Sequence, residues 1–390
     1  MPADPLIYLI AGEPSGDLLA AGLMAGLKAL TGGRVAFAGI GGEAMRGEGL
    51  VSLFPQADLA VMGLAEVVPR IPRILGRLDQ TMADIAARRP AAVVTVDSWG
   101  FTGRVAKRLK ARGSVVPRIH YVAPMVWAWK AQRVHQLAER VDLLLCLLPN
   151  EPAYFTAAGL RAIHVGHSVL ESGADRGNGP AFRDRHGIAP EAPLLCVLPG
   201  SRRSETSRLL PIFAETVGRL AADRPGLRVV VPTVETVRNE VAHAIGSWPV
   251  STILVTGMAD RYDAFAASRA ALAASGTVAL ELALAGLPMV VAYRVARLTA
   301  LLARRLLKIR HVSLPNLLMD RAIVPEYLQE ECRPDRLAAA VGLLMDDETV
   351  RRGQLAGLAA ALDRLGRGGD PPSLRAAQEV LRLIEGEHRQ

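Results

Sequence analysis

The 390-residue chain is half hydrophobic, carries a formal net charge of +8 and has three widely separated cysteines. Its length predicts two or three domains, the cysteine spacing excludes a zinc ribbon and a disulfide framework, and we expect a reduced cytosolic compartment. No uncharged apolar stretch reaches the roughly 18–20 residues of a membrane span and no signal peptide is expected, so we predict a soluble or peripheral protein with an anionic partner.

Short β-rich runs alternate with Ala-, Leu- and Arg-rich segments of helix length in the first half of the chain. This alternation predicts a parallel sheet with helices on both faces. The expected strands are 7–10, 35–38, 92–96, 119–122, 143–147 and 162–165.

A Gly-, Pro- and Asp-rich stretch at 172–192 predicts a linker or boundary, after which the alternation restarts. We therefore predict an α/β protein with two Rossmann-like domains, 1–180 and 181–365, that face each other across a cleft. Residues 366–390 are expected to form a linker and a terminal helix that packs on the first domain or on a partner chain. The expected strands of the second half are 194–198, 229–231, 253–255, 271–273 and 289–291.

The first candidate site is the turn Gly12-Glu13-Pro14-Ser15-Gly16-Asp17, between an apolar run and a helical stretch. A strand, a glycine-rich turn and a helix start are typical of a phosphate site. The two carboxylates of this turn, however, are poor neighbours for a diphosphate.

Asp97 follows the expected strand 92–96, at the sheet edge where ligands of open α/β sheets bind. A carboxylate there could take a proton from an attacking hydroxyl. A helix N-cap is an equally weighted alternative. Trp127 is interpreted as core or cleft wall rather than a sugar platform, and His167 as a buried structural histidine.

The segment VLPGSRRSE, 197–205, follows a strand and opens a helix. Gly200 permits close approach of a ligand, the Ser201 amide lies at the positive end of the helix, and Arg202 can contact phosphate bidentately. These residues predict diphosphate binding. The alternative is an ordinary N-cap serine with solvated arginines.

The segment 273–290 carries a second turn, Ser275-Gly276-Thr277, between a strand and a helix. Glu281 falls four residues after Thr277, on the same helical face. Amides and hydroxyls of the turn suit phosphate, and Glu281 suits the two ribose hydroxyls. The alternative is a capped helix with one exposed glutamate, but together with 197–205 the pattern favours a nucleoside diphosphate.

Two stretches, 67–78 and 294–311, combine arginines with apolar residues. Such patches can lie on an anionic bilayer, although a solvated amphipathic face is commoner. The sequence has no P-loop, no HExxH and no Asp-x-Asp pair, so we expect no metal or other cofactor. No nucleic-acid-binding module is recognisable.

Together these motifs resemble the lipid A disaccharide synthases, a family of inverting glycosyltransferases with two Rossmann-like domains. The resemblance runs along the chain, and 312–332 is its most specific part. The matching segments are AGEPSGD (11–17), DLAVMGLAEV (58–67), HYVAPMVWAWK (120–130), LPNEPAYF (148–155), VGHSVLE (165–171), LPGSRRSE (198–205), ASGTVALE (274–281), MVVAYR (289–294) and VSLPNLLMDRAIVPEYLQEEC (312–332).

The resemblance implies that UDP-2,3-diacylglucosamine and 2,3-diacylglucosamine 1-phosphate (lipid X) form a β-1′,6-linked disaccharide 1-phosphate and UDP. This is a step of lipid A and lipopolysaccharide biosynthesis in Gram-negative bacteria. The family pattern makes Asp97 the preferred base, Arg202 and Ser201 the stabilisers of departing UDP, and Asn316 a neighbour of the nucleotide. It also implies a peripheral enzyme at the inner face of the inner membrane, with a possible homodimer.

One departure from the family pattern follows Asp97. Where the family often has a second aspartate, this chain has Gly100. A mechanism with two carboxylates there is in doubt, and Glu13 or Asp17 could share the proton transfer.

The resemblance also moves the opening turn to the acceptor side of the cleft. Glu13 and Asp17 would accept hydrogen bonds from sugar hydroxyls, Gly12 and Gly16 would admit the acceptor, and Ser15 and Trp127 would lie beside it. Two alternatives stay open: a sugar-nucleotide enzyme similar to UDP-N-acetylglucosamine 2-epimerase, and a non-catalytic membrane-surface protein that binds UDP-sugars.

Overall fold

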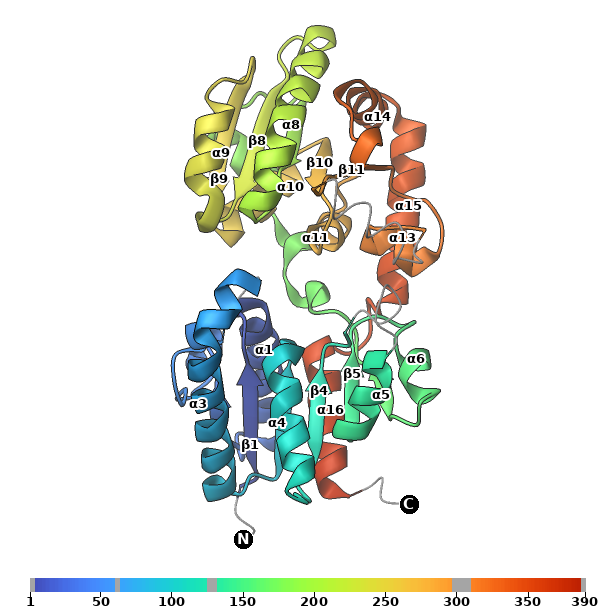
Figure 1. Cartoon of the computed structure of the whole chain (residues 1–390). Helices are drawn as coiled ribbons and strands as arrows, with labels where there is room; N and C mark the ends of the chain where they lie inside the picture. Colours follow the sequence, from blue (N-terminus) through green and yellow to red (C-terminus); the bar gives the residue numbers. More distant parts are fainter. Residues whose placement is uncertain (1–3, 60–63, 125–131, 297–309, 387–390) are drawn as a thin grey trace. The chain divides into compact units, whose positions relative to one another are not determined.

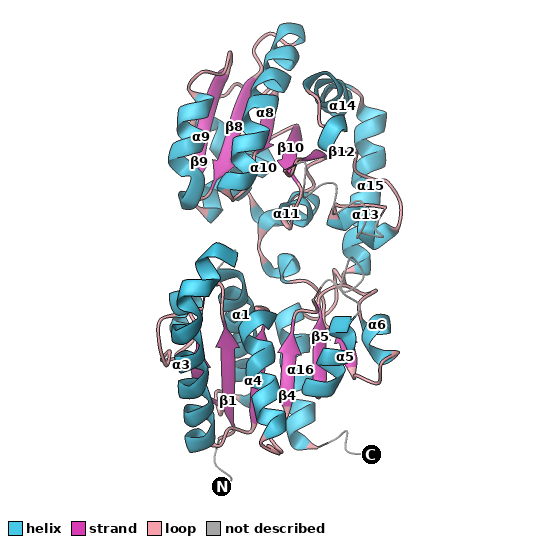
Figure 2. Ribbon diagram, viewed as in Figure 1, coloured by secondary structure: helices cyan, strands magenta, loops and turns pink. Residues whose placement is uncertain are grey.

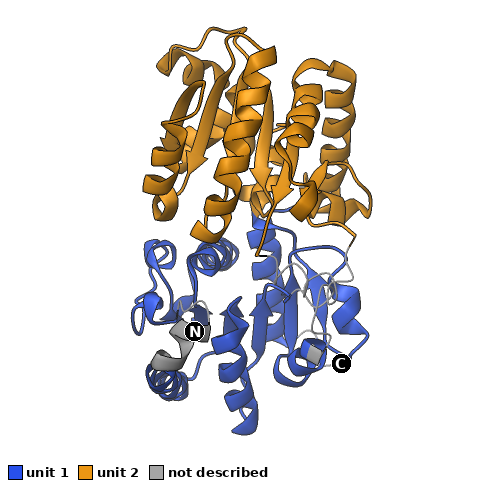
Figure 3. Cartoon of the chain, turned by 45° about the horizontal axis from the view of Figure 1, so that its top comes forward, with its two compact units in different colours: residues 1–168, 369–390 blue, residues 169–368 orange. Residues whose placement is uncertain are grey.

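The computed structural model of the chain describes residues 4–59, 64–124, 132–296 and 310–386. The chain forms two compact units: unit 1 comprises residues 1–168 and 369–390, and unit 2 comprises 169–368 (Figure 3). Each unit is built on a six-stranded parallel sheet with helices packed on it (Figure 2). The predicted α/β class with two Rossmann-like sheets is confirmed.

The sheet of unit 1 has the order β2-β1-β3-β4-β5-β6, with every neighbouring pair parallel. Its central strands are buried on both faces, which explains their continuous apolar sequence. The strands are β1 (Leu6–Ala11), β2 (Ala36–Ile40), β3 (Ala92–Val96), β4 (Arg118–Tyr121), β5 (Leu143–Cys146) and β6 (Ala162–His164).

Alternate residues of β1 enter different hydrophobic cores. Ile7 and Leu9 pack with α1 and α16, whereas Tyr8 and Ile10 pack with α3 and α4. This period of two places helices on both faces of the sheet. The helices of unit 1 are α1 (Pro14–Thr31), α2 (Glu43–Gly47), α3 (Leu64–Arg88), α4 (Trp99–Ala111), α5 (Gln132–Arg140), α6 (Pro152–Thr156) and α16 (Pro372–Glu385), with a 3₁₀ turn at Gln56–Asp58; another 3₁₀ turn, Ser168–Glu171, spans the boundary with unit 2.

The C-terminal helix α16 belongs to unit 1 although it follows unit 2 in the chain. It packs along α1, and in Figure 1 it appears in red among the blue and green elements of that unit. Glu379 pairs with Arg161 at 2.8 Å, and the Arg375 guanidinium donates to the carbonyl of His164 at 2.7 Å. The end of the chain thus completes one face of the first sheet.

The sheet of unit 2 repeats the parallel scheme in the order β12-β11-β10-β7-β8-β9. Its strands are β7 (Leu194–Leu198), β8 (Arg228–Thr233), β9 (Ser251–Thr256), β10 (Ala270–Ala274), β11 (Met289–Tyr293) and β12 (Glu326–Leu328). Its helices are α7 (Gly179–Arg185), α8 (Arg203–Asp223), α9 (Arg238–Ile245), α10 (Met258–Ala267), α11 (Val278–Leu284), α13 (Leu314–Met319), α14 (Pro334–Asp346) and α15 (Glu348–Arg364), with 3₁₀ turns at Ala174–Arg176, Glu235–Val237 and Gln329–Glu331.

Two elements differ from the expectation. The stretch 172–192 contains α7, which Asn178 caps through a bond from the Ala181 amide at 3.0 Å, and which packs on α10. The edge strand β12 was not predicted; its sequence, Glu326-Tyr327-Leu328, is partly exposed throughout and contains no apolar run. Among the described residues, no helix is both long and apolar enough to span a bilayer.

Candidate functional site

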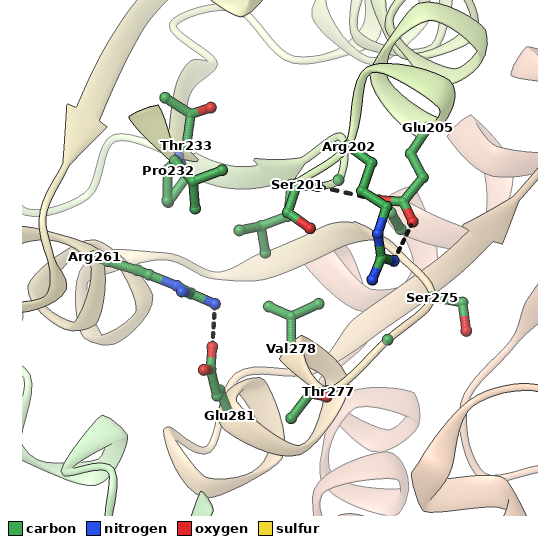
Figure 4. Close-up of a pocket in the computed structure, with 15 residues that line it drawn as sticks. Ser201, Arg202, Glu205, Pro232, Thr233, Arg261, Ser275, Thr277, Val278 and Glu281 are labelled. Carbon is green, nitrogen blue, oxygen red and sulfur yellow. Dashed lines mark hydrogen bonds and ion pairs between the residues drawn. The ribbon is translucent and has the colours of Figure 1, made fainter. Parts of the chain in front are cut away.

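A pocket of about 330 Å³ lies at the carboxyl ends of the central strands of unit 2 (Figure 4). The turns after β7, β8 and β10 form it together with α10 and α11. It brings together seven residues that the sequence predicts for the donor site: Gly200, Ser201, Arg202, Ser275, Gly276, Thr277 and Glu281. Thus two motifs that lie more than seventy positions apart in the chain share one cavity.

The turn after β7 is held by Glu205, which sequence reasoning had not singled out. Its carboxylate accepts from the Ser201 amide at 3.1 Å and pairs with Arg202 at 3.2 Å. Gly200 is required here, because its φ is 113° and an added Cβ would lie 2.6 Å from Glu205 Oε2. The Ser201 amide, expected to meet phosphate, is therefore engaged within the protein, while the Arg202 side chain keeps 62% of its surface exposed.

Glu281 meets a partner that the sequence had not indicated. Arg261, from α10, donates to its carboxylate, and the two side chains point toward each other across the pocket (Figure 4). Burial raises the pKa of Glu281 above its ordinary value, and the Arg261 guanidinium opposes that rise. Glu281 is thus neither an exposed surface glutamate nor an isolated ribose acceptor.

The expectation that Asn316 lies beside the nucleotide is corrected. Asn316 is fully buried and does not line this pocket. Its amide nitrogen donates to the carbonyl of Val324 and to Glu326, each at 2.8 Å, and its oxygen accepts from the amides of Ile323 and Val324. These bonds fasten α13 to the segment that leads into β12.

A second cavity, of about 640 Å³, lies at the carboxyl ends of β3 and β4 in unit 1. Asp97 and Glu13 both line it, so the preferred base and one carboxylate of the opening turn share a site. The other lining residues are Leu59, Ile74, Ser98, Trp99, Gly100, Phe101, Arg104, His120, Val122, Ala123, Pro124 and Arg133.

The backbone of this cavity is strained where the candidate base stands. Asp97, Ser98 and Val122 have φ values of 50°, 45° and 83°. Positive φ is uncommon for residues other than glycine and costs about 1–3 kcal/mol each, and such residues cluster at functional sites. Ser98 precedes α4 without a side-chain cap bond, and among the described residues the Asp97 carboxylate accepts no hydrogen bond from the amides of that helix. The geometry favours the interpretation of Asp97 as a site residue over the N-cap alternative.

The opening turn is only partly a ligand wall. Gly12 is buried, and an added Cβ would lie 2.8 Å from Ser98 Oγ. The missing side chain of this glycine therefore leaves room for Ser98, not for an acceptor. Gly16 likewise packs against the Val96 carbonyl. Ser15 is exposed and does not line the cavity.

The expectation that Asp17 shares the proton transfer is also corrected. Its side chain is 5% exposed, and its carboxylate accepts from the amides of Gly42, Ala44 and Met45 at 2.7–3.2 Å. Asp17 therefore satisfies the amino end of α2 and does not line the cavity.

His120, at the end of β4, is a cavity residue that sequence reasoning had treated as structural. Its Nδ1 lies 2.8 Å from Thr95 Oγ1, and the Thr95 hydroxyl donates to the Ile119 carbonyl. The threonine oxygen is therefore an acceptor for Nδ1–H, which leaves Nε2 with a lone pair. Burial lowers the pKa of His120 to about 3, so the ring is neutral at physiological pH.

Other expectations fall outside these two cavities. Trp127 lies outside the described residues, as do Arg297, Arg304, Arg305 and Lys308 of the second basic stretch. His167 is 7% exposed and lines neither cavity. No cluster of three or more His, Cys, Asp or Glu side chains suited to a metal ion occurs within the described parts of the chain.

Comparisons with known proteins show the family to which the chain belongs. A sequence model of the family described as lipid-A-disaccharide synthetase matches residues 7–360. Proteins named lipid-A-disaccharide synthase are similar along nearly their whole length. The one from Paramagnetospirillum magneticum is 59% identical, with 97% of both chains covered, and the one from Rhodospirillum centenum is 55% identical, with 97% of this chain and 94% of that chain covered.

Solved structures agree on the fold. The UDP-GlcNAc 2-epimerase from Neisseria meningitidis bound to UDP-GlcNAc has a TM-score of 0.64, with 97% of this chain and 99% of that chain covered. Its identity is 10%, so this likeness shows the two-Rossmann architecture alone. The match over residues 7–360 and the 59% identity are decisive: this chain belongs to the lipid-A-disaccharide synthase family of glycosyltransferases.

Proposed function

We propose that this enzyme joins UDP-2,3-diacylglucosamine to 2,3-diacylglucosamine 1-phosphate and releases UDP. The product is the β-1′,6-linked disaccharide 1-phosphate. The observation that carries the proposal is the pocket of unit 2, in which both nucleotide motifs meet, in a chain of this glycosyltransferase family.

The donor would bind in the pocket of unit 2. The turn Ser275–Thr277 and the amino end of the 21-residue helix α8 would receive the diphosphate, because a helix amino terminus carries roughly half a positive charge. Arg202 and Arg261 would add positive charge as negative charge develops on departing UDP. Glu281, oriented by Arg261, would accept hydrogen bonds from the ribose.

The acceptor would bind in the cavity of unit 1. Asp97 would take the proton of the 6-hydroxyl while that oxygen bonds to the anomeric carbon of the donor. The bond from this carbon to the UDP oxygen breaks, and its electron pair leaves with UDP. Attack opposite the leaving group inverts the configuration, and a single positioned base suffices. Glu13 would accept hydrogen bonds from the sugar hydroxyls.

Both substrates carry acyl chains, so we place the reaction at the inner face of the inner membrane. Support comes from α3, where Ile71 and Leu75 are each 44% exposed beside Arg73, whose side chain is 65% exposed although it lies 3.9 Å from Asp58. Arg77 supports it less, because it pairs with Asp58 at 2.6 Å and stacks over Phe54. Homodimer formation stays a prediction, and analytical ultracentrifugation of the purified protein would test it by measuring its mass in solution.

Purified protein incubated with both acylated substrates tests the proposal. We expect release of UDP together with the disaccharide 1-phosphate, detected by mass spectrometry. UDP-N-acetylglucosamine without an acylated acceptor serves as the control and should give neither UDP nor an epimer. Turnover of that control, with no disaccharide from the acylated pair, would replace the proposal with the epimerase alternative. UDP-sugar binding without turnover of either would favour the non-catalytic alternative.

A further inference from the structure

Two guanidinium groups in the cavity of unit 1 have no assigned task. Arg104 projects from α4 and Arg133 from α5, and both line the cavity that contains Asp97 and Glu13. Among the described residues, neither arginine has an ion pair or a side-chain hydrogen bond. Three arginines on neighbouring elements are engaged: Arg108 with Asp79, Arg118 with Asp142, and Arg140 with the Gly103 carbonyl.

The charges of this cavity are therefore not paired with one another. Neither Glu13 nor Asp97 forms an ion pair in the part of the chain that the structure describes, although both share the cavity with two guanidiniums. Apolar side chains, among them Ile74, Phe101 and Val122, form part of its wall. Arg104 is exposed and Arg133 is half-buried, and a guanidinium that no carboxylate contacts keeps its N–H donors for an anion.

The chemistry of arginine narrows the class of anion. A guanidinium presents N–H donors in a planar fork that matches two oxygens of a phosphate, and it stays charged at every physiological pH. The carboxylates of the same cavity repel an anion but accept hydrogen bonds from hydroxyl groups. A ligand with a phosphate at one end and hydroxyls at the other suits both sets of groups.

We infer that Arg104 and Arg133 form the subsite for the phosphate of the acceptor sugar, a role that rests on the proposed function. The acceptor carries its phosphate on C1 and its reactive hydroxyl on C6. Holding the phosphate at the arginines would leave the opposite end of the sugar toward Asp97. The preference for a phosphorylated acceptor would then be set in unit 1, independently of donor binding in unit 2.

The test compares lipid X with 2,3-diacylglucosamine, its counterpart without phosphate, in the full-length enzyme. Arg104→Gln and Arg133→Gln should each raise KM for lipid X by about tenfold, the effect of about 1.4 kcal/mol of lost binding. KM for the acceptor without phosphate and KM for the UDP-sugar should stay unchanged. Lys107→Gln is the matched control: Lys107 is an exposed cation on α4 that does not line the cavity, and its loss should change nothing.

Two kinetic results would overturn the inference. An undiminished preference for lipid X in both arginine variants would remove the subsite. A raised KM for the UDP-sugar, with KM for lipid X unchanged, would assign the arginines to the donor diphosphate instead.

A binding measurement separates this inference from the proposed function. Glucosamine 1-phosphate, titrated into the protein without donor, should bind wild type and Lys107→Gln about tenfold more tightly than either arginine variant. That result would support the subsite even if no disaccharide formed, in which case the proposed function alone would fail. Equal affinity in all four proteins would overturn the subsite, whatever the turnover.

Discussion

The ion pair between Arg261 and Glu281 decides how the donor pocket responds to pH. Burial raises the pKa of the Glu281 carboxyl, and the guanidinium of Arg261 counteracts that rise. The neutral acid accepts hydrogen bonds less well than the carboxylate does. UDP affinity should therefore fall as the pH falls through the pKa of Glu281.

Removal of the guanidinium should move this acid limb to higher pH. Arg261→Gln leaves the buried carboxyl without its cation, so its pKa rises further and protonation begins at a less acidic pH. UDP affinity at neutral pH should fall roughly 10- to 100-fold, since a hydrogen bond to a charged group is worth about 1.5–3 kcal/mol. Calorimetric titration with UDP across pH measures both effects.

Arg203→Gln is the control for Arg261→Gln. Arg203 also stands near the start of α8, but its side chain is 84% exposed and it does not line the pocket. It should bind UDP as wild type does at every pH. An acid limb that stays in place in Arg261→Gln would contradict the assigned role of Arg261.

For single residues, sequence reasoning identified those whose role follows from their position directly after a strand. Gly200, Arg202 and Ser275 follow strands, and the parallel sheet brings them into one pocket. It failed where a partner from another element decides the role. The Asp17 carboxylate accepts hydrogen bonds from amides at the start of α2, and Asn316 accepts them from the segment before β12. Neither partner is visible from local spacing.

At the scale of elements, buried strands were predictable, whereas the partly exposed edge strand β12 was not. β3 and β7 are buried along their whole length, and apart from Thr95 their sequences are continuous apolar runs. The Gly- and Pro-rich stretch around α7 gives no helical period. Its order comes from α10, where Asp263 accepts from the Asn178 amide and pairs with Arg185.

The exposed face of α3 carries a prediction of its own. Replacement of Ile71 and Leu75 by glutamate should weaken binding to anionic phospholipid vesicles by about tenfold or more, because each buried apolar side chain contributes about 1.5–3 kcal/mol. Activity toward short-chain, water-soluble substrates should persist. Co-sedimentation with vesicles measures the loss.

Val51→Glu is the control for that surface. Val51 is 87% exposed in the same unit but lies outside α3, so its replacement should leave vesicle binding intact. Equal vesicle binding by wild type and the double α3 variant would show that this face does not contact the membrane.

At the scale of the whole molecule, the two units would divide the reaction between them. The pocket of unit 2 gathers arginines, a helix terminus and a buried glutamate, which suit a nucleoside diphosphate. The cavity of unit 1 places Asp97 on strained backbone beside Glu13 and two arginines, which suits a sugar phosphate that must lose a hydroxyl proton. The described residues that line each site belong to one unit.

The most direct test of this division is Asp97→Asn, assayed in parallel for turnover and for UDP affinity. We expect kcat to fall by about 10²- to 10⁴-fold, the contribution of a general base, while Kd for UDP stays unchanged. Asp79→Asn is the matched control, since Asp79 is an exposed carboxylate of unit 1 outside the cavity, and it should keep wild-type kcat. Wild-type turnover in Asp97→Asn, or a loss of UDP affinity that accounts for its loss of activity, would contradict the account.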